Sequence, residues 1–147
     1  MADEGRGEVT IDAPIDAVWA VVTDLAAYPS WAGDIKHVEV LTTDAHGRPA
    51  TAAFRVGGFG VTVGYTIEYD YDPPSTVRWH LLSSTELRRM DGEYLFSGEA
   101  NGGTRVEYRL TVDLKIPVLG MVKRKAERTI IHHALSGLKQ RVEEASG

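Results

Sequence analysis

The segment from about Pro117 to Glu144 constrains the fold more than any other part of the chain. Its apolar residues recur every three or four positions, which is the spacing of an α-helix with one buried face. At about 1.5 Å per residue, a helix of this length spans roughly 40 Å, about the width of a small domain. An apolar face of that size requires a large apolar surface elsewhere in the chain.

The region between Ile35 and Lys115 provides that surface, because almost all of it has the pattern of β-strands. Apolar and polar residues alternate most regularly from Val61 to Tyr71, which indicates a strand with one buried and one solvated face. The sequence therefore predicts an α+β fold, in which a curved antiparallel sheet of seven strands wraps around one long C-terminal helix.

The last hairpin of this sheet allows a prediction of register. A three-residue loop, Asn101–Gly103, would pair Phe96 with Tyr108 and Glu99 with Arg105. Inward-facing side chains then lie opposite one another, as a sheet with one buried face requires.

The N-terminal part predicts a strand followed by two short helices. Glu8–Ala13 alternates in polarity, and Pro14 suits the first turn of a helix, where a missing N–H costs nothing. We expect a second short helix over Leu25–Tyr28, ended by Pro29. Residues 1–6 are polar and rich in glycine, and we expect them to be disordered.

Composition sets broad limits on function. With 147 residues, 43% of them hydrophobic, the chain is expected to form one domain over residues 1–147. A net charge of −5 argues against a general nucleic-acid binder. The absence of cysteine excludes disulfides and a thiol nucleophile, and we expect no metal and no cofactor. No stretch is long and apolar enough to span a bilayer, so a cytoplasmic location is expected.

Several segments, in this order, resemble the START-like helix-grip (SRPBCC) superfamily, most closely its bacterial polyketide cyclase/dehydrase and lipid-transport branch. They are Ala13–Trp19, Asp24, Tyr28–Trp31, Gly103–Val106 and Leu135–Lys139. The resemblance implies a deep, mostly apolar cavity between the curved sheet and the last helix. Members of the superfamily bind lipids, sterols, polyketides, hormones or quinones there. Only some catalyse a reaction, so the fold leaves the chemistry open.

The residues expected to line that cavity form an aromatic, apolar surface with a few hydroxyl groups, which is typical of a small-molecule site. The candidate ligand-binding residues are Phe54, Tyr65, Ile67, Tyr69, Trp79, Leu81, Tyr94, Phe96, Tyr108, Leu110, Val122, Ala126, Ile130 and His133. Binding of a hydrophobic small molecule, such as a lipid or polyketide, is the leading interpretation. A filled core, and with it an interaction module, is one alternative, because periodicity does not distinguish a filled interior from a hollow one.

A polyketide cyclase or dehydratase is the other alternative. Such an enzyme needs a general acid or base near its substrate, yet the alternation turns every Asp and Glu between Val61 and Leu114 outward. Helix spacing turns His133 toward the sheet, so His133 is the candidate catalytic residue, together with the cavity tyrosines. A lone helical histidine is nevertheless more often a packing residue. We expect Glu127 to pair with Lys123 on the surface.

The start of the last helix combines apolar and basic residues. The segment contains Val118, Leu119, Met121, Lys123, Arg124 and Lys125. This pattern predicts an amphipathic patch that contacts a membrane surface. A partly buried helix start with a solvated basic face is the alternative.

Overall fold

The computed structural model describes residues 5–58, 61–115 and 120–146. The elements are, in chain order, β1 (Gly5–Ile11), α1 (Ile15–Thr23), the 3₁₀ turn η1 (Leu25–Ala27), α2 (Tyr28–Trp31), β2 (Ile35–Thr43), β3 (Pro49–Gly58), β4 (Val61–Asp72), β5 (Thr76–Ser84), β6 (Leu87–Gly98), β7 (Thr104–Leu114) and α3 (Gly120–Ser146).

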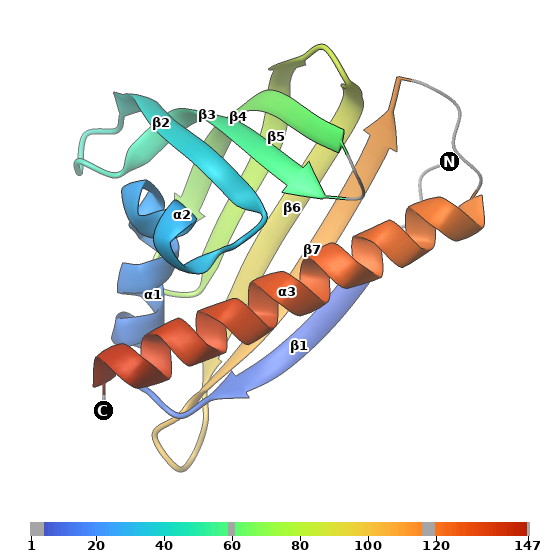
Figure 1. Ribbon diagram of the computed structural model, residues 1–147. Coiled ribbons are helices and arrows are strands. Elements are labelled where there is room, and N and C mark those ends of the chain that lie inside the picture. Colours follow the sequence, from blue (N-terminus) through green and yellow to red (C-terminus); the bar gives the residue numbers. More distant parts are fainter. Residues whose placement is uncertain (1–4, 59–60, 116–119, 147) are drawn as a thin grey trace.

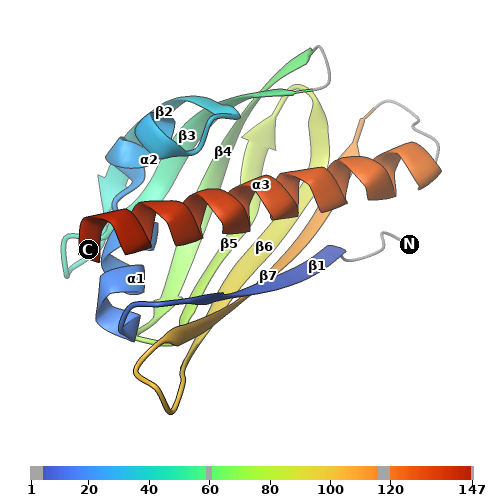
Figure 2. The ribbon, with the colours of Figure 1, turned by 60° about the horizontal axis from the view of Figure 1, so that its bottom comes forward.

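The seven strands form one antiparallel sheet in the order β1-β7-β6-β5-β4-β3-β2. From β2 to β7 each strand pairs with the next one in the chain, and β1 pairs with β7 at the other edge of the sheet. The sheet curves, α3 crosses its concave side, and α1 and α2 lie toward one end (Figures 1 and 2). This arrangement confirms the α+β helix-grip fold predicted from the sequence.

Strand β1 begins earlier than the sequence predicted. Gly5 pairs with Leu110 and Arg6 with Arg109, so the expectation of disorder is wrong for these two residues. The glycines of this segment have a structural role in the strand, because α3 packs directly on them. A Cβ atom on Gly7 would lie only 2.5 Å from Ile131 Cγ2. The absence of side chains at Gly5 and Gly7 therefore lets helix and strand come into close contact.

Helix α3 turns one stripe of side chains into the core, in contact with β1, β7 and α1. Its fully buried apolar residues are Ile131, Leu135, Leu138 and Val142. The neighbouring stripe, which includes Ala126 and Ile130, is half-buried. The described helix begins at Gly120, and the expected helical residues from Pro117 to Leu119 lie outside the described part of the chain.

The β6–β7 hairpin differs from the predicted register by two residues. Tyr108 pairs with Tyr94, and Phe96 pairs with Val106 rather than with Tyr108. The connection is Glu99–Gly103, in which Gly102 has a φ of +88°. A shift of two residues keeps inward side chains opposite one another, so the hydrophobic pattern alone did not distinguish the two registers.

The two short helices after β1 are present, with one change of boundary. Pro29 does not end a helix but lies in the first turn of α2, and the preceding residues form η1. Proline is compatible with that position because the first N–H groups of a helix have no intrahelical partner.

Candidate functional site

Aromatic side chains cover the concave face of the sheet from β3 to β7. Phe54 stacks on Tyr65, with ring centroids 5.4 Å apart. Farther along the sheet, Trp79 contacts Tyr94 at 5.5 Å, and Tyr94 meets Tyr108 edge-on at 4.7 Å. Such contacts fix the orientation of each ring and direct the phenol hydroxyls of the three tyrosines to defined places.

Two tyrosines of the fold have hydrogen-bonded hydroxyl groups. Tyr28 Oη donates to the backbone oxygen of Val22, and Tyr71 Oη donates to that of Pro49 at 2.6 Å. These hydroxyls are satisfied by the protein itself and so have a structural role.

The hydroxyls of four other tyrosines, Tyr65, Tyr69, Tyr94 and Tyr108, make no hydrogen bond within the described residues. They are not completely enclosed either. In the same part of the chain, Trp31 Nε1 is the one fully buried side-chain nitrogen or oxygen without a partner. The four hydroxyls therefore border space that water can reach.

Burial raises the pKa of Tyr65, Tyr69, Tyr94 and Tyr108 well above the usual tyrosine range. Desolvation is the main cause, because a phenolate loses its hydration inside the fold. At neutral pH these side chains are uncharged phenols. They can donate a hydrogen bond to a carbonyl or hydroxyl oxygen, but they do not act as phenolate bases.

Most of the predicted ligand-binding residues lie in or beside this concave face. Those that are buried are Phe54, Ile67, Trp79, Tyr94, Phe96, Tyr108 and Leu110. Those that are half-buried are Tyr65, Tyr69, Leu81, Ala126 and Ile130.

Val122 and His133 are the exceptions. Val122 is 55% exposed, because it precedes the part of α3 that packs on β1. The His133 side chain is 56% exposed, and its Nδ1 lies 3.0 Å from Asp34 Oδ2 in the loop before β2. The expected inward orientation of both residues is therefore wrong.

Glu127 is buried where the sequence predicted a surface position. It is only 3% exposed, and its Oε2 accepts a hydrogen bond from the backbone N–H of Val112 at 3.1 Å. The expected pairing with Lys123 is present at 3.3 Å.

Trp31 of α2 packs against α3 at Gly137. A Cβ atom on Gly137 would lie 3.5 Å from the Trp31 ring, at ordinary contact distance. Trp31 also meets Tyr28 edge-on at 5.2 Å. The glycine thus marks a close approach between α2 and α3.

The outer face of the sheet has a different character. A depression of about 440 Å³ lies there, and its acidic and arginine residues are equal in number: Asp70, Asp91, Glu93, Arg78, Arg89 and Arg109. Because these charges balance, the depression does not select strongly for a ligand of either sign.

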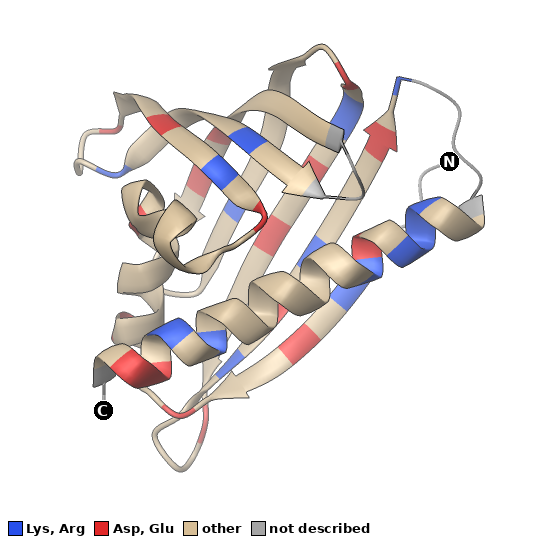
Figure 3. Ribbon diagram, in the orientation of Figure 1, with Lys and Arg blue, Asp and Glu red and all other residues tan. Residues whose placement is uncertain are grey.

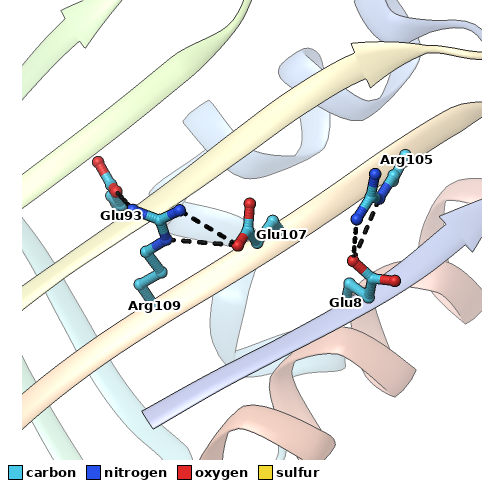
Figure 4. A network of polar contacts seen from close by, with 5 residues as sticks. All are labelled: Glu8, Glu93, Arg105, Glu107 and Arg109. Carbon is cyan, nitrogen blue, oxygen red and sulfur yellow. Dashed lines mark hydrogen bonds and ion pairs between the residues drawn. The ribbon is translucent and has the colours of Figure 1, made fainter. Parts of the chain in front are cut away.

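Ion pairs connect the strands across this outer face, as Figure 4 shows. Arg109 lies 3.3 Å from both Glu93 and Glu107. Arg105 of β7 pairs with Glu8 of β1 in the same way. These five charged side chains therefore pair with one another on this face.

Among the described residues, no group of three or more His, Asp or Glu side chains is arranged to hold a metal ion. None of the helices described is both long and apolar enough to cross a membrane.

The fold agrees with comparisons to known proteins. The profile of the family described as polyketide cyclase/dehydrase and lipid transport matches residues 11–139. The chain belongs to this family. A comparison with curated proteins found no significant sequence match.

Solved structures resemble the chain over its whole length. A START superfamily protein from Mycobacterium smegmatis has a TM-score of 0.90 at 22% identity, covering 97% of this chain and 98% of that one. A protein from Thermus thermophilus has a TM-score of 0.84 at 26% identity, covering 99% of this chain and 100% of that one. The Zhui aromatase/cyclase from Streptomyces sp. R1128 gives 0.81 at 17% identity, covering 100% and 97%.

Proposed function

We propose that the chain binds a hydrophobic small molecule, such as a lipid or a polyketide, between the concave face of the sheet and α3. The observation that carries this proposal is the set of four water-accessible tyrosine hydroxyls that have no hydrogen-bond partner among the described residues. A buried hydroxyl left without a hydrogen bond costs about 1–3 kcal/mol. Water or a bound molecule removes that cost, whereas a tightly filled core does not.

The surrounding chemistry favours a mostly apolar, uncharged ligand. Glu68, Glu93 and Glu107 lie on the opposite face of the sheet, each within 3.3 Å of a histidine or arginine side chain. Neutral phenols are suited to carbonyl, hydroxyl or ether oxygens of a bound molecule. The aromatic rings supply apolar contact, and the hydroxyls orient the ligand.

The variant Ala126→Trp tests for a hollow interior, with the neutral fluorophore N-phenyl-1-naphthylamine as the probe. Ala126 belongs to the half-buried stripe of α3. In a cavity the indole would occupy ligand space, so we expect the melting temperature to fall by only a few degrees while probe uptake is lost. Ser136→Trp, on the exposed side of the same helix, is the matched control and should keep the probe.

Two results would overturn the proposal. A wild type that takes up no probe, together with an Ala126→Trp variant that unfolds or aggregates, would favour a filled interaction module, because overpacking a solid core costs about 1–3 kcal/mol. A folded Ala126→Trp variant that binds the probe like wild type would move the site elsewhere. Native mass spectrometry of protein from its own host, followed by extraction, then identifies the ligand.

A polyketide cyclase or dehydratase is the second candidate. The family description and the likeness to an aromatase/cyclase support it. A neutral phenol such as Tyr94 or Tyr108 can stabilise a developing enolate by donating a hydrogen bond. A general base is still required, and His133, the sequence-based candidate, is exposed and lies beside Asp34 rather than facing the cavity. Release of water or ring closure in a candidate polyketide, followed by mass spectrometry, tests this activity.

A further inference from the structure

We infer that the N-terminal part of α3 docks on an anionic membrane surface through a patch formed by Met121, Val122, Lys125 and Arg128, called the α3 patch below. This inference is independent of what the interior binds. It revises the amphipathic patch predicted from the sequence, of which Val118 and Leu119 lie outside the described residues.

The apolar part of the α3 patch is unusually exposed. Met121 is 76% exposed and its neighbour Val122 is 55% exposed. A single exposed hydrophobic residue is ordinary on a protein surface. Two adjacent ones at the start of a helix, both directed away from the core, form a small apolar tip that water solvates poorly.

The basic part of the α3 patch lies on the same side of the helix. Met121, Lys125 and Arg128 are spaced at i, i+4 and i+7, which places them along one face. Both basic side chains are exposed, and neither forms an ion pair within the described part of the chain. Their charges are therefore available to a partner.

Lys123 does not belong to the α3 patch, although the sequence suggested it. Its Nζ lies 3.3 Å from Glu127 and 3.7 Å from Asp113, and its side chain is mostly covered. The positive charge of Lys123 is thus balanced within the fold.

Charge complementarity favours an anionic lipid surface as the partner. The chain carries a net charge of −5, yet four basic residues and one acidic residue lie between Gly120 and His132. Figure 3 shows lysine and arginine segments gathered on this half of α3. An amphipathic helix of this kind buries its apolar side at the acyl boundary while its basic residues contact the headgroups.

A nucleic acid fits the α3 patch less well. The phosphate groups of a nucleic acid form ion pairs with basic side chains, but they make no favourable contact with the exposed apolar side chains of Met121 and Val122.

Co-sedimentation with vesicles tests the inference. We expect binding to vesicles of about 70% phosphatidylcholine and 30% phosphatidylserine at low salt, and loss of binding at high salt, because salt screens exposed charges over about 8–10 Å near physiological ionic strength. The double variant Lys125→Glu/Arg128→Glu should lower the partition coefficient at least tenfold. Met121→Ser/Val122→Ser should lower it at least threefold without any change of charge.

A matched control distinguishes the effect of the charges in the α3 patch from the effect of the net charge of the chain. Lys36 and Arg141 are exposed, lie outside the α3 patch and form no ion pair among the described residues. The variant Lys36→Glu/Arg141→Glu changes the net charge as much as the test variant, but it should bind within twofold of wild type. All variants should retain uptake of N-phenyl-1-naphthylamine, so a failure of membrane binding is distinguishable from a failure of ligand binding.

Four outcomes would overturn the inference: no binding to anionic vesicles at low salt, equal binding to pure phosphatidylcholine, equal loss in the test and control variants, or unchanged binding after Met121→Ser/Val122→Ser. Binding to heparin as tight as to the anionic vesicles would instead indicate a general polyanion site and would also reject the membrane assignment.

Discussion

His133 Nδ1 lies 3.0 Å from Asp34 Oδ2, so the middle of α3 is joined to the loop between α2 and β2 by an exposed polar contact. The same region holds the contact of Trp31 with Gly137. The two contacts together fix α2 against α3 beside the concave face. This position gives His133 a structural explanation that does not involve catalysis.

Removal of this contact should have small effects. Exposed ion pairs contribute about 0–1 kcal/mol, so we expect His133→Ala and Asp34→Asn each to lower the unfolding free energy by less than about 1 kcal/mol. Urea denaturation measures this change, and probe uptake should remain within about twofold of wild type. A loss of turnover of an identified substrate in His133→Ala, with Asp34→Asn fully active, would instead support the acid–base role.

Two tyrosines should respond differently to loss of the hydroxyl. Tyr94 Oη has no partner among the described residues, so Tyr94→Phe should leave the unfolding free energy within about 0.5 kcal/mol of wild type. Tyr28 Oη donates to Val22 O, so Tyr28→Phe should cost about 1 kcal/mol. Urea denaturation compares the two. Equal losses would mean that the Tyr94 hydroxyl also has a structural partner, and the argument for a water-accessible interior would weaken.

Alkaline pH should destabilise the fold through the buried tyrosines. Burial raises the pKa of Tyr65, Tyr69, Tyr94 and Tyr108 above the unfolded value of about 10. Below about pH 10 these tyrosines are protonated in both the native and the unfolded state, so the unfolding free energy keeps its full value. Above it the unfolded state releases protons that the native state retains, so the unfolding free energy falls.

Tyrosinate absorbance and circular dichroism, followed together, measure this effect. We expect the buried tyrosines to ionise only as the protein unfolds. In Tyr94→Phe/Tyr108→Phe the decline of stability above about pH 10 should be shallower than in wild type. Ionisation of all six tyrosines in a still-folded protein near pH 10 would contradict the burial described above.

The contact of α3 with β1 should depend on Gly7. A Cβ atom there would lie 2.5 Å from Ile131 Cγ2 and 3.0 Å from Leu135 Cδ1. We therefore expect Gly7→Ala to lower the unfolding free energy by about 1–3 kcal/mol, as overpacking does. Gly98→Ala is the matched control, because nothing lies within 4 Å of its new Cβ. Ile131→Ala should partly rescue Gly7→Ala, and purely additive losses would exclude this steric explanation.

The sequence determined the elements and their apolar faces. Alternation along β4 and the stripe of α3 are local properties, because each follows from the repeat of one strand or one helix. A curved sheet around a long helix is the arrangement that buries both surfaces. Aromatic residues such as Tyr65, Trp79 and Tyr94 could be assigned to the concave face for the same reason.

Tertiary packing determined whether the residues at the edges of those apolar faces are buried or exposed. The sequence turned His133 inward and left Glu127 on the surface, whereas the structure exposes His133 and buries Glu127. The close packing of α3 on β1 explains this difference. Because Gly5 and Gly7 have no side chains, Ile131 packs directly on β1, and this contact sets the rotation of α3 about its axis. A periodic pattern defines the width of an apolar stripe, but only the shape of the opposing surface fixes its centre. For the same reason the β6–β7 register, which can shift by two residues without changing faces, was settled by the turn at Gly102.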